Sequence, residues 1–326
     1  MRLLKKTNID FVGIRKITYA ISLILILASL GGLIFRGLNW SIDFTSGVAA
    51  RINLKAKSGN VANVQIDEFR DVLKQNGFPE AEIQYMGDME NSIFQIKIKS
   101  AESKEEVDGD TKTAILRIVA ENFPDHVAGR DMNNEVVEEI YEVGPKVGGE
   151  LRANALLAVL ISMVLMIVYI WFRFELSFGV MAIAALAHDV IIVIGVFALT
   201  GKEITIQIIA ALLTIVGYSI NDTIVVFDRI REDLKLRRKE PLENVFNSSI
   251  NRSLSRTVIT LVTTFLTAFA LYLFGGSVLH DFALAITIGV VVGTYSSVFI
   301  ASNLVLDLNR SLGKEKQAVQ GLTRRK

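Results

Sequence analysis

Long uncharged, apolar stretches dominate the chain and alternate with short charged segments. A helix needs about 20 apolar residues to cross the hydrocarbon core of a bilayer. Six stretches reach about that length, and we predict spans at 17–36, 153–172, 176–200, 204–227, 256–279 and 282–306. The first follows a basic leader but is longer than the roughly 7–15-residue core of a signal peptide, so we interpret it as an uncleaved anchor. The pattern predicts a polytopic α-helical membrane protein with six transmembrane helices.

Between the first two predicted spans, residues 37–152 have the pattern of a folded polar domain. Alternating apolar and polar positions indicate half-buried strands, and apolar stripes at helical spacing indicate amphipathic helices. Strands are expected at 47–56, 81–86, 92–99 and 135–143, and helices at 63–76 and 111–122. The order βαββαβ is typical of a ferredoxin-like α/β domain.

The predicted α/β domain is acidic. Residues 37–150 carry 12 Lys and Arg against 21 Asp and Glu, whereas the rest of the chain carries 23 against 13. An acidic surface serves solubility or takes part in binding, and the sequence leaves both interpretations open. The domain contains no nucleophile–base signature and no Gly-rich phosphate loop. We therefore expect a binding or mechanical domain.

The distribution of Lys and Arg predicts the orientation, because short cytoplasmic loops carry an excess of both. Twenty basic residues lie in the ends and loops of one side, at 1–16, 173–175, 223–256 and 307–326. The opposite short loops contain one, Lys202. We therefore assign the N-terminus 1–16, the loop 228–255 and the tail 307–326 to the cytoplasm, and 37–152 to the extracytoplasmic side.

Composition excludes several classes of site. The chain is 51% hydrophobic and has no cysteine, which excludes disulfides, cysteine-ligated metals and thiol catalysis. Its three histidines are too few for a His-rich metal site. We expect no enzyme activity, no catalytic residues, no metal site and no cofactor. The basic stretch 228–239 lacks interleaved aromatic residues and favours anionic membrane lipids over a protein partner, with no nucleic-acid binding.

Ionisable side chains inside a bilayer are costly and usually face a bundle interior or a water-filled cavity. Asp189, with His188 beside it, lies near the midplane of the third predicted span, about 20 Å from its start at 1.5 Å per residue. It takes part in proton movement or only bridges a helix interface, and the sequence does not separate these roles. Depth alone favours Asp189 as the ion-coupling group.

A second pair of charges lies closer to the cytoplasmic side. Asp222 precedes Asp228 by six residues at the end of the fourth predicted span, and Arg256 opens the fifth. We predict that Asp222 and Arg256 lie at comparable depth and form an ion pair. A carboxylate held between burial and an opposite charge can load and release a proton. The same pair can instead serve only to fix helix packing.

Five motifs resemble those of the SecF family, which comprises SecD/SecF accessory subunits of bacterial protein export. They are DFTSG at 43–47, VGPKVGGEL at 143–151, AHDV at 187–190, GYSINDTIVVFDRIRE at 217–232 and NRSLSRT at 251–257. The resemblance runs from the first predicted span to the sixth, and the motif at 217–232 is highly specific. The family commonly has Gly where this chain has Ser46, which bears on the backbone freedom of that turn.

The resemblance implies a subunit similar to half of a pseudo-symmetric transporter of the resistance–nodulation–division superfamily. SecF proteins pair with SecD, which gives twelve spans, and work with the SecYEG channel and SecA. They use the proton motive force, or sodium in some marine relatives, to pull preproteins outward across the bacterial plasma (inner) membrane. H⁺, or Na⁺ in its place, is therefore the expected coupling ion.

The resemblance also assigns roles to residues. Asp222 is expected to carry the ion, with Arg256 as its partner and Asp189 as a second candidate. Supporting residues from the matching motifs are His188, Asn221, Ser219, Gly217, Asp43 and Gly47.

Two rival functions follow from the same pattern. A small-molecule or lipid exporter of this superfamily needs a roomy apolar pocket in the outer domain, which looks too small to supply one alone. A purely structural stabiliser of the export channel would use the ion pair for packing.

Overall fold

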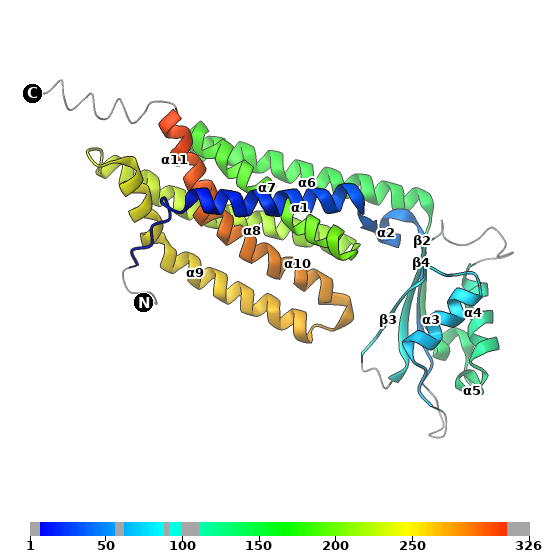
Figure 1. Cartoon of the computed structure of the whole chain (residues 1–326). Coiled ribbons are helices and arrows are strands. Elements are labelled where there is room, and N and C mark those ends of the chain that lie inside the picture. Colours follow the sequence, from blue (N-terminus) through cyan, green and yellow to red (C-terminus); the bar gives the residue numbers. More distant parts are fainter. Residues whose placement is uncertain (1–6, 56–61, 88–90, 100–110, 312–326) are drawn as a thin grey trace, which may run out of the picture.

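The computed structural model describes residues 7–55, 62–87, 91–99 and 111–311. Long helices lie side by side in one bundle, and a smaller α/β domain lies beyond one end of it (Figure 1). Parts of three predicted segments lie outside the described residues: 1–6 of the N-terminus, residue 56 of the strand 47–56, and 312–326 of the tail.

Six helices within the described ranges are long and apolar enough to cross a membrane, as predicted. They are α1 (Arg15–Phe35), α6 (Pro145–Arg173), α7 (Leu176–Thr200), α8 (Ile206–Leu236), α9 (Leu242–Phe274) and α10 (Gly276–Tyr295), the last continued by η3 (Ser296–Ala301) and α11 (Ser302–Ser311). Helix α7 has the bounds that the sequence predicts.

Other helices extend beyond the predicted spans. Helix α6 begins at Pro145, ahead of the predicted 153–172, and α8 continues to Leu236, past the predicted 204–227. The added turns contain charged residues, which a count of uncharged residues leaves out. These helices therefore project from the apolar layer.

The predicted boundary between the last two spans is wrong. Helix α9 ends at Phe274, short of the predicted 256–279, and α10 begins at Gly276, ahead of the predicted 282–306. Gly276 has a φ of +71°, in the left-handed region that favours glycine, and the chain reverses there. An uncharged glycine turn interrupts a helix without interrupting an apolar run.

The α/β domain is a four-stranded antiparallel sheet with its helices on one face (Figure 1). Its elements are β2 (Gly47–Asn53), α3 (Ile66–Gln75), β3 (Glu82–Tyr85), β4 (Ile93–Lys99), α4 (Thr111–Asn122), α5 (Pro124–Val127), η2 (Met132–Val136) and β5 (Val137–Val143). The strand order is β3-β4-β2-β5, the ferredoxin-like arrangement expected for the predicted βαββαβ sequence of elements. Phe69 of α3 packs on Phe94 of β4, with ring centroids 5.0 Å apart, and joins the helix to the sheet.

Two short strands tie this domain to the bundle. Strand β1 (Asn39–Trp40) pairs in parallel with β6 (Glu203–Ile204), which connects α7 to α8. The Ser41 amide donates to the Ile204 carbonyl at 3.0 Å. The helical turn α2 (Ile42–Thr45) follows and packs against α6.

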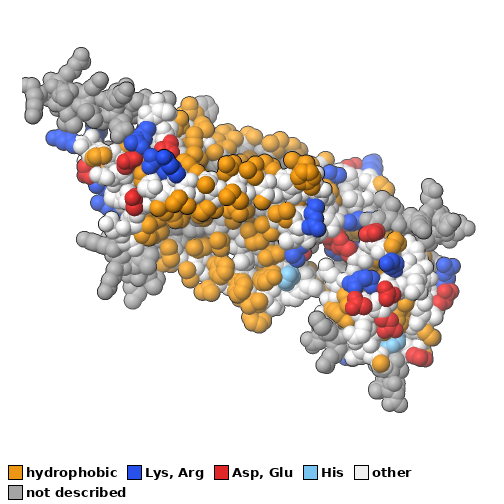
Figure 2. All heavy atoms as spheres, viewed as in Figure 1, with side chains coloured by type: hydrophobic (Ala, Val, Ile, Leu, Met, Phe, Trp, Pro, Cys, Tyr) orange, Lys and Arg blue, Asp and Glu red, His pale blue; other side chains and the backbone are white. Residues whose placement is uncertain are grey.

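The helices of the bundle differ in how far they are covered. In α7, α8 and the last span, 56% of the most apolar stretch is buried, against 6% in α6 and 11% in α9. Apolar side chains cover much of the outer surface of the bundle (Figure 2). Close packing at the centre depends on small residues: a Cβ on Gly293 would lie 3.0 Å from the Ser219 Cβ.

Candidate functional site

Asp222 lies on α8 inside the bundle, with 4% of its surface exposed. Its Oδ1 accepts a hydrogen bond from the Thr257 hydroxyl of α9 at 3.0 Å. Its Oδ2 is buried and has no hydrogen-bond partner among the residues that the structure describes. A buried polar atom without a partner costs about 1–3 kcal/mol, and more when charged. This oxygen is therefore a place where a proton or a small cation can bind.

Arg256 does not contact the Asp222 carboxylate. Its side chain is exposed, and within the described ranges no ion pair shorter than 4.0 Å joins the two. Consecutive helix residues point about 100° apart, so Thr257 and Arg256 cannot both point directly at Asp222, and Thr257 is the one in contact. The predicted Asp222–Arg256 ion pair is not formed in this structure. Thr257 is a contact that the sequence analysis missed, although it belongs to the motif at 251–257.

Asp189 lies on α7 and is the more deeply buried carboxylate, with 1% of its surface exposed. Its Oδ2 accepts hydrogen bonds from the hydroxyls of Ser219 at 2.6 Å and Ser296 at 2.8 Å. Its Oδ1 lies 2.9 Å from Nδ1 of His188, the preceding residue. Every carboxylate oxygen of Asp189 thus has a partner, in contrast to Asp222.

The supporting residues on α8 have different surroundings. Ser219 is fully buried and joins α8 to Asp189. Asn221 is exposed. A Cβ added to Gly217 would have no neighbour within 4 Å. Of the three, only Ser219 contacts a candidate ion-coupling residue.

Asp43 lies at the junction of the two domains, away from the buried carboxylates of the bundle. Its Oδ2 accepts hydrogen bonds from the Ser41 hydroxyl at 3.0 Å and the Ile206 amide at 3.4 Å. Since Ile206 is the first residue of α8, Asp43 places a negative charge at the positive end of that helix.

The turn that follows Asp43 explains the last supporting residue. A Cβ on Gly47 would lie 2.2 Å from the Ile98 carbonyl oxygen, so only glycine fits there. Ser46 has a φ of +74°, which an L-residue with a Cβ rarely adopts. The chain therefore keeps the conformation that a glycine would take, at a cost in backbone strain.

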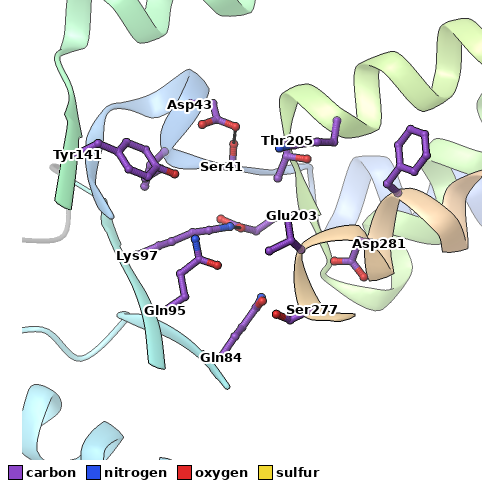
Figure 3. A pocket seen from close by; sticks show the side chains of 14 residues that line it. Ser41, Asp43, Gln84, Gln95, Lys97, Tyr141, Glu203, Thr205, Ser277 and Asp281 are labelled. Atoms are coloured by element: carbon purple, nitrogen blue, oxygen red, sulfur yellow. Dashed lines mark hydrogen bonds and ion pairs between the residues drawn. The ribbon is translucent and has the colours of Figure 1, made fainter. Parts of the chain in front are cut away.

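A buried ion pair at the junction was missed by the sequence analysis. Lys97 of β4 points from the α/β domain toward Glu203 of β6, and Nζ lies 2.5 Å from Oε2 (Figure 3). Glu203 is 7% exposed, and its Oε1 has no hydrogen-bond partner among the described residues. The pair lies in a polar cavity of about 100 Å³ that Asp43, Tyr141 and Asp281 also line.

The junction changes the protonation equilibrium of both partners. Burial raises the pKa of Glu203 to about 7, and the nearby Glu82 carboxylate adds to this, while Lys97 opposes it. Burial lowers the pKa of Lys97, but the charge and hydrogen bond of Glu203, together with the charges of Glu82 and Tyr141, raise the pKa overall. Lys97 is therefore charged at neutral pH, where Glu203 lies near its midpoint.

Metal ligands are not clustered in the described part of the chain, where no three His, Asp or Glu side chains could hold one ion. The buried carboxylates described above, Asp189 and Asp222, are each surrounded by hydroxyl or histidine side chains.

Comparisons with known proteins all identify SecF or SecDF proteins as relatives of this chain. The C-terminal family of the SecD/SecF protein export membrane proteins matches residues 125–311. The chain is 42% identical over 303 residues to protein translocase subunit SecF of Magnetococcus marinus, covering 93% of each. It is also 42% identical over 303 residues to protein translocase subunit SecDF of Thermus thermophilus, covering 91% of this chain and 38% of that protein.

Solved structures agree with these relatives. The crystal structure of SecDF, a translocon-associated membrane protein from Thermus thermophilus, aligns with a TM-score of 0.76 at 41% identity, over 93% of this chain and 39% of that one. SecDF in a super-membrane-facing form aligns with a TM-score of 0.69, over 97% of this chain and 41% of that one. The chain thus spans about two fifths of the length of SecDF.

Proposed function

Because the chain belongs to the SecF family of protein translocase subunits, we propose that it couples the proton motive force to late-stage export of preproteins across the bacterial plasma membrane. It acts without enzymatic chemistry as a multi-pass subunit in complex with SecD, next to the SecYEG channel and SecA. H⁺ is the proposed coupling ion, and Na⁺ is the alternative.

The observation that carries this proposal is the unpartnered Oδ2 of Asp222. A carboxylate that is 4% exposed and accepts one hydroxyl hydrogen bond has an open position for a proton. Proton binding removes the charge and supplies a donor, so occupied and empty states differ in what surrounds Asp222. Asp189 is the second candidate because of its depth in the bundle.

When Asp222 has no bound proton and is ionised, Arg256 is its proposed partner. Thr257 contacts Asp222 here, and Arg256 is the preceding residue on α9. In the proposed cycle an ionised Asp222 attracts Arg256, whereas a protonated Asp222 keeps the Thr257 contact. The exchange requires α9 to turn against α8. Within this chain few contacts oppose such a turn, because only 11% of the most apolar stretch of α9 is buried.

The sparsely covered helices also support the proposed partner. Few residues in the most apolar stretches of helices α6 and α9 are buried in this chain. The SecDF relative, of which this chain matches 38%, is a longer single chain. We therefore assign these surfaces to contact with SecD and membrane lipids.

In this proposal the α/β domain, between the first two spans, lies on the extracytoplasmic side, and both termini lie in the cytoplasm. It is the proposed moving part that holds the emerging preprotein. One charge that crosses 100 mV releases about 2.3 kcal/mol. A population shift from 1:99 to 99:1 takes about 5.5 kcal/mol. A full swing therefore uses more than one charge, and a partial swing uses one.

Inverted membrane vesicles test the proposal. We expect the gradient-dependent part of preprotein export to collapse in Asp222→Asn and in Arg256→Met, while the complex with SecD still assembles. Asp228→Asn is the matched control, because Asp228 lies six residues further along α8 and pairs with Arg173 at an exposed position. Full gradient-dependent export in both variants would refute the proposal and favour a purely structural role.

A further inference from the structure

A chain of hydrogen bonds crosses the bundle at His188, a buried residue that the proposed cycle does not use. Tyr295 donates its hydroxyl proton to the Thr18 carbonyl at 2.8 Å. Ser22 Oγ lies 3.1 Å from the same hydroxyl, and His188 Nε2 lies 3.1 Å from Ser22 Oγ. On the other side of the ring, His188 Nδ1 lies 2.9 Å from Asp189 Oδ1.

The Thr18 carbonyl, at the end of this series of hydrogen bonds, determines which atom donates in each of them. A carbonyl oxygen only accepts, so the single hydroxyl proton of Tyr295 is committed to Thr18. Ser22 must then donate its own proton to Tyr295. With that proton committed, Ser22 Oγ can only accept from the ring, which places a proton on His188 Nε2.

A second proton is required on the opposite side of the ring. A neutral imidazole carries one ring N–H proton, and the hydrogen bonds of Tyr295 and Ser22 require that proton to be on Nε2. Nδ1 would then face Asp189 Oδ1 lone pair to lone pair at 2.9 Å unless another proton lies between them. That proton belongs to a carboxylic acid beside a neutral ring or to an imidazolium beside a carboxylate. In both cases the two residues together carry no net charge.

We infer that His188 and Asp189 hold one shared proton in addition to the proton on Nε2, and that this neutral pair positions the spans without carrying the transported ion. The statement that the pair does not carry the transported ion rests on the proposed function. It assigns ion loading to Asp222 and makes Asp189 and His188 positioning residues.

The surroundings of Asp189 fit this role. Ser219 of α8 and Ser296 of η3 both donate to Oδ2. Through Ser22, the His188 ring reaches α1. One neutral pair on α7 thus holds three neighbouring segments at the centre of the bundle. Within the described ranges, Asp189 forms an ion pair with no residue except His188.

The position of the ring proton can be measured directly, because the chain has only three histidines. We would record ¹⁵N-histidine NMR spectra of the full-length chain in lipid bilayers and assign His188 with His188→Gln. The expected result is a proton on Nε2 of His188 and a hydrogen bond at Nδ1. An Nε2 without a proton would overturn the inference.

His280 is an internal reference for the same spectra. Its Nδ1 lies 3.1 Å from Oδ1 of the following Asp281, as in the buried pair, but its side chain is 39% exposed. The described residues give its Nε2 no hydrogen-bond partner. A Tyr272→Phe variant, which alters the ring beside His280, should leave the His188 signals in place. If the His188 signals shift together with those of His280 in this variant, the His188 ring is not held by a fixed series of hydrogen bonds.

Asp189→Asn separates positioning from ion transfer. An Asn amide can donate to His188 Nδ1, and its oxygen can accept from Ser219 and Ser296, so it reproduces the protonated carboxyl. We expect gradient-dependent export within about twofold of wild type. Asp189→Leu removes these bonds, and we expect it to lower the yield of folded protein. A loss of gradient-dependent export in Asp189→Asn as large as in Asp222→Asn would overturn the inference.

The two proposals fail in different ways. If Asp222→Asn and Asp189→Asn both export normally, ion coupling through Asp222 is refuted, while the NMR spectra still decide the protonation of His188. If only Asp189→Asn loses gradient-dependent export, Asp189 carries the ion. The inference that Asp189 is a positioning residue is then refuted, whereas the coupling of export to the ion gradient is not.

Discussion

The bundle and the domain junction each contain a buried carboxylate with one oxygen that lacks a hydrogen-bond partner among the described residues. The two carboxylates differ in what faces the other oxygen. Asp222 is 4% exposed and accepts a hydrogen bond from the Thr257 hydroxyl. Glu203 is 7% exposed and faces the Lys97 ammonium at 2.5 Å. Burial of an ionised carboxylate is costly unless an opposite charge or a proton compensates it. The junction therefore supplies its own compensation, whereas Oδ2 of Asp222 has no hydrogen-bond partner among the described residues.

The origin of the compensating group also differs. Lys97 comes from the α/β domain and Glu203 from the loop between α7 and α8, so their bond spans two domains. Thr257 and Asp222 both come from helices of the bundle. A change of charge at Glu203 therefore acts on how the domains are joined, whereas a change at Asp222 acts on how helices pack.

The largest effect is expected from Lys97→Met at pH 8, where Glu203 carries its charge. Loss of one partner leaves the other charge buried, which typically costs about 3–5 kcal/mol. The free energy of local opening at the junction should fall by about that amount. Hydrogen exchange of the Ser41 amide, which donates to the Ile204 carbonyl, measures it.

The double variant Lys97→Met/Glu203→Gln is the matched control. It removes the stranded charge as well as its partner, so protection of the Ser41 amide should largely return. Equal exchange in wild type and in Lys97→Met would mean that the pair does not hold the junction closed, and the contrast with Asp222 would disappear.

The fold could be predicted where local pattern decides it. Helix α4 has the bounds predicted from its apolar stripe, 111–122, and the strands of the sheet begin and end within three residues of their predicted bounds. The turn at Gly276 was misplaced because an uncharged glycine does not interrupt a count of apolar residues. A left-handed turn is a backbone property that hydropathy does not measure.

The burial of the two candidate carboxylates could be predicted from the sequence, but their contacts could not. The apolar surroundings of Asp222 and Asp189 identified both as buried charges. Which residue reaches Asp222 depends on the rotation of α9, and one position along that helix separates Thr257 from Arg256. Lys97 and Glu203 are 106 residues apart in the sequence. Neither the periodicity of apolar residues nor a sequence motif indicates that these two residues are in contact.

The second effect, of intermediate size, is a pH dependence of the junction. The pKa of Glu203 is about 7 when the junction is closed, raised by burial from the ordinary value of 4.5 that applies when the junction opens. The closed junction therefore binds the proton more tightly. Its added stability is fully present below pH 4.5 and is lost as the pH rises through 7, by about 3 kcal/mol.

Hydrogen exchange of the Ser41 amide at several pH values, corrected for the intrinsic exchange rate, checks this trend. Glu203→Gln should abolish it, since an amide does not titrate. A junction that becomes more protected between pH 5 and 7 in wild type would reverse the sign and show that the Lys97 ion pair, not burial, dominates at Glu203.

The smallest effect is expected from Thr257→Val, which removes the hydroxyl that donates to Asp222 and keeps the size of the side chain. A single hydrogen bond contributes about 1 kcal/mol net, well below the loss expected from Lys97→Met. Thr260→Val is the control, because its hydroxyl donates to the Arg256 carbonyl on an exposed part of the same helix. The free energy of unfolding in mixed micelles measures both variants. A loss of several kcal/mol confined to Thr257→Val would show that Asp222 is held as firmly as Glu203. The carboxylate would then be a packing device, and the weak hold that lets α9 exchange Thr257 for Arg256 would not exist.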